Sequence, residues 1–383
     1  MNANFSPGST PEREALDAEI LGWMRESHWA VDDARFEALA LRLFAHQVAA
    51  CPPYARFATA RGRVPGEVLR WQEIPAVPAG AFKEVDLRGF PESRTIKTFR
   101  TSGTSGQKPG ELHLDSLVLY EASLMASLGT LLFPDRISSG RAADPALHLR
   151  LLAPAARESP DSSLSHMFQV LLDELGSPSS GFDVVDGRLE AEALAGRLEA
   201  AQTRNEAVAL CGTAFSFVHL IEFLEARGAG FQCAPGSRIM ETGGFKGRSR
   251  EMPRDELYSA LERCLGIPPS RIVNQYGMTE LGSQFYDSVW VDPEGPRRKL
   301  GPPWVRVRLV DPETGEESPP GEPGMVVVHD LANTGSIAAL QTADLGRAVM
   351  ASGDDPQGFE ILGRQPGAEA RGCSIAADEM LSG

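Results

Sequence analysis

A ten-residue stretch from Thr101 to Gly110 concentrates residue types suited to binding a polyphosphate. It holds three glycines, four hydroxyl side chains and one lysine. Glycine permits a backbone with positive φ and a close approach to a ligand. Successive peptide N–H groups then form an anion-binding concavity, with hydroxyls as further donors. The residues expected to contact phosphate are Thr101, Ser102, Gly103, Thr104, Ser105, Gly106 and Lys108.

The residues on either side decide which kind of loop this is. A Walker-type loop requires G-x-x-x-x-G-K-[ST] leading directly into a helix, whereas Gly106 is followed by Gln107. Residues 95–100 are rich in β-formers, and residues 111–114 alternate polar with apolar side chains. We therefore expect the loop to join two strands. A Ser/Gly-rich surface loop without a ligand is the alternative.

Three further groups of residues are suited to recognising a nucleotide. In Asn274-Gln275-Tyr276-Gly277-Met278-Thr279-Glu280, Tyr276 can stack on a base and the Glu280 carboxylate can hold Mg²⁺. The pair Gly243-Gly244 follows a predicted strand and forms either a ligand-lining turn or an ordinary glycine turn. Asp344 can accept hydrogen bonds from two ribose hydroxyls.

Composition narrows the classes of protein. The chain has 383 residues, 42% of them hydrophobic, and a net charge of −15, which argues against a nucleic-acid partner. The five scattered cysteines lack a C-x-x-C pair and fit reduced thiols in a cytoplasmic protein without a structural metal. Neither a signal sequence nor a membrane-spanning apolar run is visible.

The motifs carry a family resemblance. T-S-G-T-S-G at 101–106 and Y-G-M-T-E at 276–280 resemble the signatures of adenylate-forming enzymes, which use ATP and Mg²⁺. Lys108-Pro109 departs from that family's usual Pro-Lys order, and Ala343 replaces its usual glycine before Asp344. The resemblance implies that the loop cradles phosphates, Thr279 contacts the AMP phosphate and Glu280 binds Mg²⁺. It also implies that the nucleotide is lined by Gly243, Gly244, Gln275, Tyr276, Gly277, Asp344 and Arg364.

The end of the sequence resembles one branch of that family. Gly363-Arg364 is similar to the hinge that opens a further domain in most members, but Lys299 is the last lysine before Gly383. The late adenylation lysine is thus expected to be absent. Cys373, in a short tail, resembles the acylated cysteine of the acyl-protein synthetases of bacterial luminescence, which implies a role as catalytic acyl acceptor.

Alternating strands and helices predict an α/β fold, and the resemblance implies the adenylate-forming architecture with a truncated C-terminal tail. We expect an α/β core at 1–283, a β-barrel-like subdomain at 284–362, and a hinge with tail at 363–383. Residues 289–291 are expected to be a strand, and His219 is expected to be a buried histidine on an apolar helix.

The expected function is ATP-dependent activation of a carboxylic acid, such as a fatty acid, to acyl-AMP. The acyl group would pass to a cysteine thiol and on to a partner reductase or carrier protein. A CoA ligase, a carrier-protein ligase and a non-catalytic nucleotide-binding scaffold remain the alternatives. Dependence of ATP–pyrophosphate exchange on an acid separates the enzymes from the scaffold.

Overall fold

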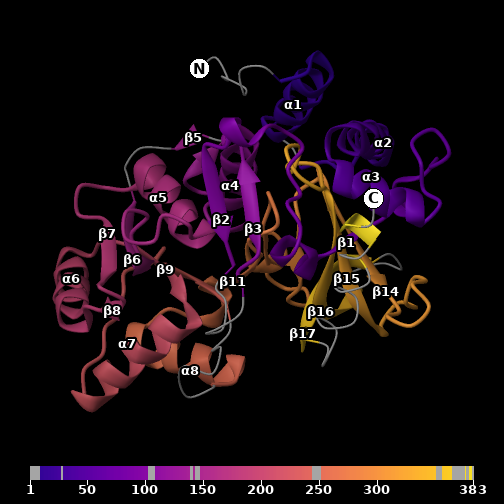
Figure 1. Ribbon diagram of the computed structural model, residues 1–383. Coiled ribbons are helices and arrows are strands. Elements are labelled where there is room, and N and C mark those ends of the chain that lie inside the picture. Colours follow the sequence, from indigo (N-terminus) through magenta and orange to yellow (C-terminus); the bar gives the residue numbers. More distant parts are fainter. Residues whose placement is uncertain are drawn as a thin grey trace. The chain divides into compact units, whose positions relative to one another are not determined.

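The chain forms two compact units in the computed structural model (Figure 1). The structure describes residues 9–26, 29–101, 108–138, 141–142, 147–243, 252–350, 356–364, 376 and 379–381. Unit 1 comprises Met1–Ala126, Gly277–Phe285 and Arg298–Gly383, and unit 2 comprises Ser127–Tyr276 and Tyr286–Arg297. The helix α4 (Val118–Leu131) and the strand β12 (Phe285–Asp287) contribute residues to both.

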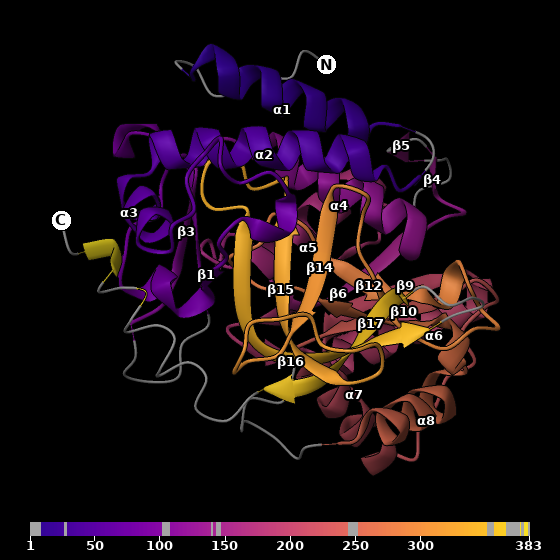
Figure 2. The same ribbon diagram turned by 90° about the vertical axis from the view of Figure 1, so that its right-hand side faces the viewer.

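Three helices open unit 1: α1 (Pro11–Met24), α2 (Asp33–Ala50) and α3 (Pro52–Ala60). The Thr10 hydroxyl accepts a hydrogen bond from the N–H of Arg13 at 3.3 Å, and Asp32 accepts one from the N–H of Arg35 at 2.9 Å. These side chains satisfy donors that the first helical turn leaves unpaired. The helices α1 and α2 pack side by side (Figure 2).

The main sheet of unit 1 is antiparallel, in the order β14-β15-β16-β17-β13, with β1 added parallel to β16. A separate hairpin joins β2 to β3. The bounds are β1 Val77–Pro78, β2 Lys97–Arg100, β3 Glu111–Leu114, β13 Lys299–Leu300, β14 Val305–Val310, β15 Pro323–Asp330, β16 Ala339–Met350 and β17 Pro356–Arg364. Short 3-10 helices cover Trp71–Glu73, Ala79–Lys83 and Glu92–Arg94.

Unit 2 is a sheet in the order β11-β10-β9-β6-β7-β8, parallel except at β8. Its strands are β6 His148–Pro154, β7 Gly181–Val185, β8 Arg188–Leu189, β9 Val208–Thr213, β10 Arg238–Thr242 and β11 Ile272–Tyr276. Its helices are α5 Ser163–Leu175, α6 Ala191–Arg204, α7 Ala214–Ala226 and α8 Arg254–Leu265. The small hairpin of β4 (Ile137–Ser138) and β5 (Arg141–Ala142) and a 3-10 turn at Pro269–Arg271 complete it.

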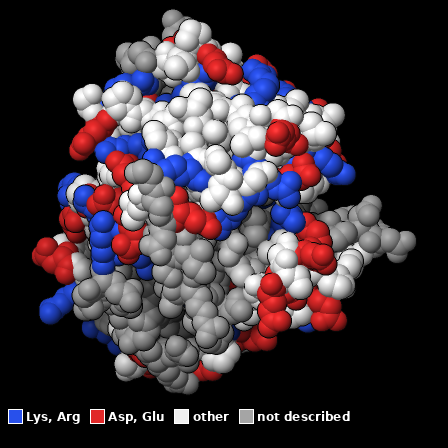
Figure 3. All heavy atoms as spheres, turned by 45° about the vertical axis from the view of Figure 1, so that its right-hand side comes forward, with Lys and Arg blue, Asp and Glu red and all other residues white. Residues whose placement is uncertain are grey.

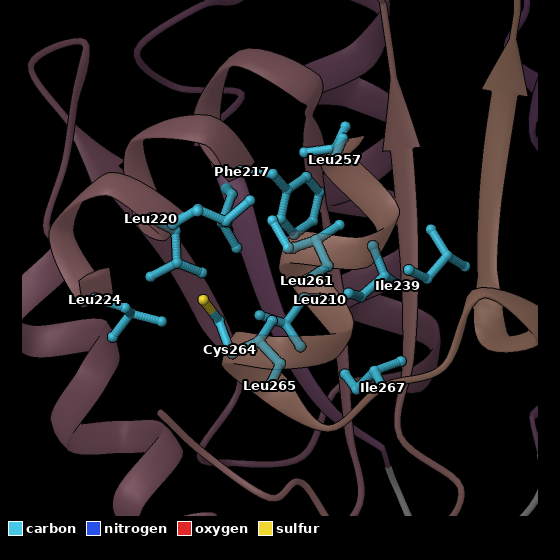
Figure 4. Close-up of a cluster of buried hydrophobic side chains, with 14 of the residues drawn as sticks. Leu210, Phe217, Leu220, Leu224, Ile239, Leu257, Leu261, Cys264, Leu265 and Ile267 are labelled. Carbon is cyan, nitrogen blue, oxygen red and sulfur yellow. The ribbon is translucent and has the colours of Figure 1, made fainter. Parts of the chain in front are cut away.

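One apolar cluster holds α6, α7 and α8 against strands of the unit 2 sheet. Figure 4 shows Phe217 and Leu220 of α7 facing Leu257 and Leu261 of α8, and all four are nearly inaccessible to solvent. Cys264 lies in the same apolar cluster as a small hydrophobic side chain. Burial of such side chains contributes roughly 1.5–3 kcal/mol each, so the cluster holds the helices firmly against the sheet.

The observed architecture is the predicted α/β class. The β-rich segment expected from residue 284 contains the antiparallel sheet of unit 1, and its closure into a barrel stays a prediction. The domain boundaries predicted at 283 and 362 also stay predictions. Each compact unit is built from separate segments of the chain, so the units do not correspond one to one with continuous domains. The strand expected at 289–291 is wrong: Ser288–Trp290 form a 3-10 helix in unit 2.

Two surface properties follow from the described residues. None of their helices combines the length and apolar character required to cross a bilayer. On the face drawn in Figure 3, basic and acidic side chains are interspersed.

Candidate active site

The predicted phosphate loop sits between paired strands, as the sequence indicates. The N–H of Thr101 donates to the carbonyl of Gly110 at 2.9 Å, and the N–H of Gly110 donates to Thr101 Oγ1 at 2.8 Å. These bonds continue the β2–β3 ladder one step beyond Arg100 and Glu111 and close the base of the loop. Lys108 is exposed. The predicted residues Ser102, Gly103, Thr104, Ser105 and Gly106 lie outside the described part of the chain.

The structure places Thr279 and Glu280 against this base. The Thr279 hydroxyl donates a long hydrogen bond, 3.5 Å, to the carbonyl of Arg100. A Cβ built on Gly110 would lie 3.5 Å from Glu280 Oε1 and 3.4 Å from Thr101 Cγ2. Two motifs separated by about 170 residues of sequence therefore meet in unit 1, with the Glu280 side chain almost fully buried.

The segment after Glu280 is anchored by a buried carboxylate that sequence reasoning missed. Asp330, at the end of β15, accepts hydrogen bonds from the N–H of Ser283 at 2.7 Å and from its hydroxyl at 2.8 Å. The Ser283 hydroxyl also bonds Ser123 Oγ at 2.8 Å, to which Trp304 Nε1 donates at 2.9 Å. Burial raises the pKa of Asp330 to about 6. The hydrogen bonds from Ser283 lower this pKa, but the effect of burial is larger.

The predicted ribose-binding residues lie directly opposite each other in unit 1. Asp344 on β16 pairs with Arg364 on β17, and Arg364 Nε lies 3.5 Å from Asp344 Oδ1. The N–H of Asp344 donates to Thr342 Oγ1 at 3.1 Å, and that hydroxyl donates to the carbonyl of Val326 at 2.9 Å. Thr342 thus ties the Asp344 backbone to the neighbouring strand. The Arg364 side chain is mostly exposed.

The remaining predicted residues lie at the carboxyl edge of the unit 2 sheet, where parallel α/β sheets bind ligands. Thr242 pairs with Thr213 of β9 on one side and with Gln275 of β11 on the other. The Thr242 hydroxyl donates to both the side-chain and main-chain oxygens of Gln275. Gly243 follows at φ +77°, a backbone region that L side chains rarely adopt. Gly244 lies outside the described residues.

A polar network behind this edge was also missed from sequence. The Glu241 carboxylate, buried at the end of β10, accepts hydrogen bonds from Tyr258 Oη at 3.0 Å and Asn274 Nδ2 at 2.7 Å. Asp287 accepts from the N–H of Asn274 at 3.0 Å and from Arg297 at 2.7 Å. Burial raises the pKa of Tyr258 far above its usual range, so its hydroxyl stays a donor. The network holds β10 and β11 in register next to Gln275.

Tyr276 and Gly277 lie where the chain passes from unit 2 to unit 1. Tyr276 is half-buried at the end of β11, and Gly277 is exposed. The Y-G-M-T-E motif therefore contributes an aromatic ring to one unit and a buried carboxylate to the other.

Among the described residues, no group of three or more His, Cys, Asp and Glu side chains could hold a metal ion. One carboxylate, such as that of Glu280, is commonly sufficient for Mg²⁺ when a polyphosphate supplies other oxygen ligands.

Two further predictions have different outcomes. His219 is not a buried histidine: its side chain is 46% exposed, 3.6 Å from Glu222 and edge-on to Phe215. The helix α7 is apolar on most sides, so composition alone does not reveal which face is exposed. Cys373 lies outside the described residues. The other four cysteines are free thiols, three of them buried and Cys233 half-buried.

Comparisons with known proteins identify the family of this chain. A family model described as acyl-protein synthetase, LuxE, matches residues 9–382. A long-chain-fatty-acid–luciferin-component ligase of Vibrio harveyi is 25% identical over 323 residues, covering 83% of this chain and 81% of that protein. The protein of the same name from Aliivibrio fischeri is 23% identical over 314 residues, covering 81% of this chain and 79% of that protein.

A solved structure shares the fold. An open conformation of 2-hydroxyisobutyryl-CoA ligase, in complex with 2-HIB-AMP and CoA, aligns with a TM-score of 0.60 and 16% identity, covering 95% of this chain and 80% of that one. This likeness shows that the chain has the adenylate-forming fold. The family match spans nearly every residue from α1 to the C-terminal segment, so the chain belongs to the acyl-protein synthetase (LuxE) family.

Proposed function

We propose that this protein activates a long-chain fatty acid with Mg-ATP and then takes the acyl group onto Cys373. As an acyl-protein synthetase the chain is an AMP-forming ligase. In the first step a carboxylate oxygen of the acid attacks the α-phosphorus of ATP, giving acyl-AMP and pyrophosphate. In the second step the thiolate attacks the acyl carbonyl, forming a thioester and releasing AMP.

The observation that supports activation best is the meeting of Thr279 and Glu280 with the base of the phosphate loop. Gly110 marks the meeting point, since a Cβ built there would lie in ordinary van der Waals contact with both Glu280 Oε1 and Thr101 Cγ2. The Thr279 hydroxyl is a donor for an α-phosphate oxygen, and the loop N–H groups and Lys108 would hold the outer phosphates. Such fixed donors supply positioning and electrostatic stabilisation, the main sources of rate in phosphoryl chemistry.

The remaining site residues orient the nucleotide. In unit 1, Asp344 would accept the ribose hydroxyls, with Arg364 beside it. In unit 2, Gly243, Gln275 and Tyr276 keep the base-binding role that the family resemblance implies. Glu280 is the residue that would hold Mg²⁺, which when bound neutralises charge on the phosphates. The exposed Arg364 can contact the ligand without a large desolvation cost.

The four cysteines that the structure describes are poorly suited to accept an acyl group, and this contrast supports Cys373 as the acceptor. Burial raises the pKa of Cys51 and Cys233 to about 11 and that of Cys211 to about 12, and it also raises the pKa of Cys264. A thiol is a nucleophile only as thiolate, so these four are poorly suited near neutral pH. In the sequence Cys373 follows Arg371-Gly372, and the nearby cation favours its thiolate.

The substrate and partner follow from the relatives. Both relatives are named for long-chain fatty acids, which supports an acyl chain of that class here. A thioester on Cys373 is an activated carrier of the acyl group. A reductase or a carrier protein with a thiol would therefore be the partner that removes it.

The activation step is tested by ATP–pyrophosphate exchange with fatty acids of increasing chain length. We expect exchange that requires both the acid and Mg²⁺. Exchange absent with every acid would refute the proposed activity.

The acceptor is tested with labelled fatty acid and ATP. Cys373→Ala should keep pyrophosphate exchange and lose the hydroxylamine-sensitive label on the protein. Cys233→Ala, which removes the half-buried thiol, is the matched control and should keep both. Label retained at the wild-type level in Cys373→Ala would show that another group accepts the acyl chain.

A further inference from the structure

A buried amide in unit 1 contacts the main chain of the proposed Mg²⁺ ligand. Asn333 lies in the loop between β15 and β16 and is 2% exposed. Its Nδ2 donates to the carbonyl oxygen of Glu280 at 3.0 Å and to that of Ile337 at 2.9 Å. Both N–H groups of one amide are therefore used, one to close its own loop and one to hold Glu280.

The helix α2 holds this loop from its other side. Gln47 Nε2 donates to the carbonyl oxygen of Asn333 at 2.9 Å, and Gln47 Oε1 accepts from the N–H of Ala338 at 3.2 Å. Gln47 is itself 2% exposed. Two buried amides thus connect α2, the β15–β16 loop and Glu280 in series.

The chemistry of the contact requires an amide. Two carbonyl oxygens need two donors at one point, and a hydroxyl side chain supplies only one. Asn333 Oδ1 is buried and has no hydrogen-bond partner among the described residues. A buried acceptor left in that state costs about 1–3 kcal/mol. An apolar residue would avoid this cost, so the asparagine is explained by the two bonds that its Nδ2 makes.

We propose that Asn333 is a positioning residue that acts through Glu280. By holding the Glu280 carbonyl, Asn333 fixes the backbone from which that carboxylate reaches the base of the phosphate loop beside Gly110. The inference rests on the proposed function, because it assigns Glu280 to Mg-ATP. Asn333 makes no contact with substrate in this scheme.

The test compares Asn333→Ala and Asn333→Asp with Ser336→Ala. Ser336 lies in the same loop, is equally buried, and donates to the carbonyl of Leu87 at 2.8 Å without contacting Glu280. Asn333→Asp keeps the size of the side chain and removes both donors. We expect the two Asn333 variants to lower kcat of acid-dependent pyrophosphate exchange at least tenfold. They should also raise the Mg²⁺ concentration for half-maximal rate several-fold, whereas Ser336→Ala stays within twofold of wild type.

A second readout separates this inference from the proposed function. ATP raises the Tm of a protein that binds it, and the Mg²⁺ dependence of that rise reports the Glu280 site without acid activation. A wild type that lacks exchange but shows an Mg²⁺-dependent ATP shift, lost in Asn333→Ala, refutes the function and supports the positioning role. If Asn333→Ala does not fold, Asn333→Ser takes its place. If the Asn333 variants show the same Mg²⁺ dependence as Ser336→Ala in both assays, the inference is overturned.

Discussion

Asp344 provides the sharpest test of nucleotide recognition, because its effects on binding and on stability are expected to differ strongly. We consider Asp344→Ala. Arg364 is 69% exposed, and its Nε lies 3.5 Å from Asp344 Oδ1. An ion pair to a largely solvated cation is worth at most about 1 kcal/mol. The variant should therefore unfold in urea almost as the wild type does.

The loss in binding should be larger. A hydrogen bond to a charged group contributes about 1.5–3 kcal/mol, and about 1.4 kcal/mol corresponds to a tenfold change. Loss of one ribose contact should raise the KM for ATP about tenfold, and loss of both should raise it about a hundredfold. The assay is acid-dependent pyrophosphate exchange at varied ATP, with 2′,3′-dideoxy-ATP as the second substrate.

The comparison between the two nucleotides identifies the contact. Wild type should prefer ATP over the dideoxy analogue, and Asp344→Ala should lose most of that preference. Asp33→Ala is the control, since Asp33 also pairs with an arginine, Arg306, at 2.8 Å, but on the exposed start of α2. If Asp344→Ala discriminates between the nucleotides as wild type does, Asp344 does not bind the ribose.

Two other predictions concern Glu280 and Asp330. Glu280→Gln should abolish acid-dependent exchange while the urea midpoint stays near wild type, because the bond from Asn333 goes to the main chain; unchanged exchange would contradict a Mg²⁺ role. Burial raises the pKa of Asp330 from 3.8 to about 6, so the folded state prefers the protonated acid. Its contribution to the unfolding free energy is then fully present below pH 4 and is lost as pH rises through about 6. From pH 4 to pH 7 the difference between Asp330→Asn and wild type should shift by about 2 kcal/mol in favour of the variant, and a constant difference in urea titrations would contradict this.

Much of the fold was predictable because local signals agree with tertiary structure. The caps at Thr10 and Asp32, the strands around the phosphate loop and the helix ended by Gly266 each depend on a few neighbouring residues. The strand expected at 289–291 failed for the opposite reason. The guanidinium groups of Arg238 and Arg271 lie 4.7 and 4.2 Å from the centroid of the Trp290 ring. Contacts from distant residues therefore override the β-propensity of this segment.

The candidate site likewise contains residues that the sequence predicted and contacts that it did not. Thr279, Glu280, Asp344 and Arg364 were predicted because ligand chemistry restricts their residue types and because the motifs resemble those of a known family. Gln47 was different: its spacing places it on the buried stripe of α2 with Leu39 and Leu43, and the structure confirms that burial. Nothing in that spacing indicates that its amide bonds the β15–β16 loop, because the partners lie 286 and 291 residues away in sequence.

The supporting polar groups explain why a buried carboxylate can stay in one place here. Glu280 lies three residues after the exposed Gly277, and its side chain would gain rotational freedom if its backbone moved. Two contacts oppose that movement, one from Asn333 to the Glu280 carbonyl and one from Asp330 to the N–H of Ser283. Both partners come from one end of the β15–β16 connection, so a shift of that connection would displace Glu280 and Ser283 together. Substitution of Asn333 should therefore alter the Mg²⁺ dependence of activation before it alters the affinity for the acid, whereas Ser336, which bonds Leu87 instead, should tolerate substitution.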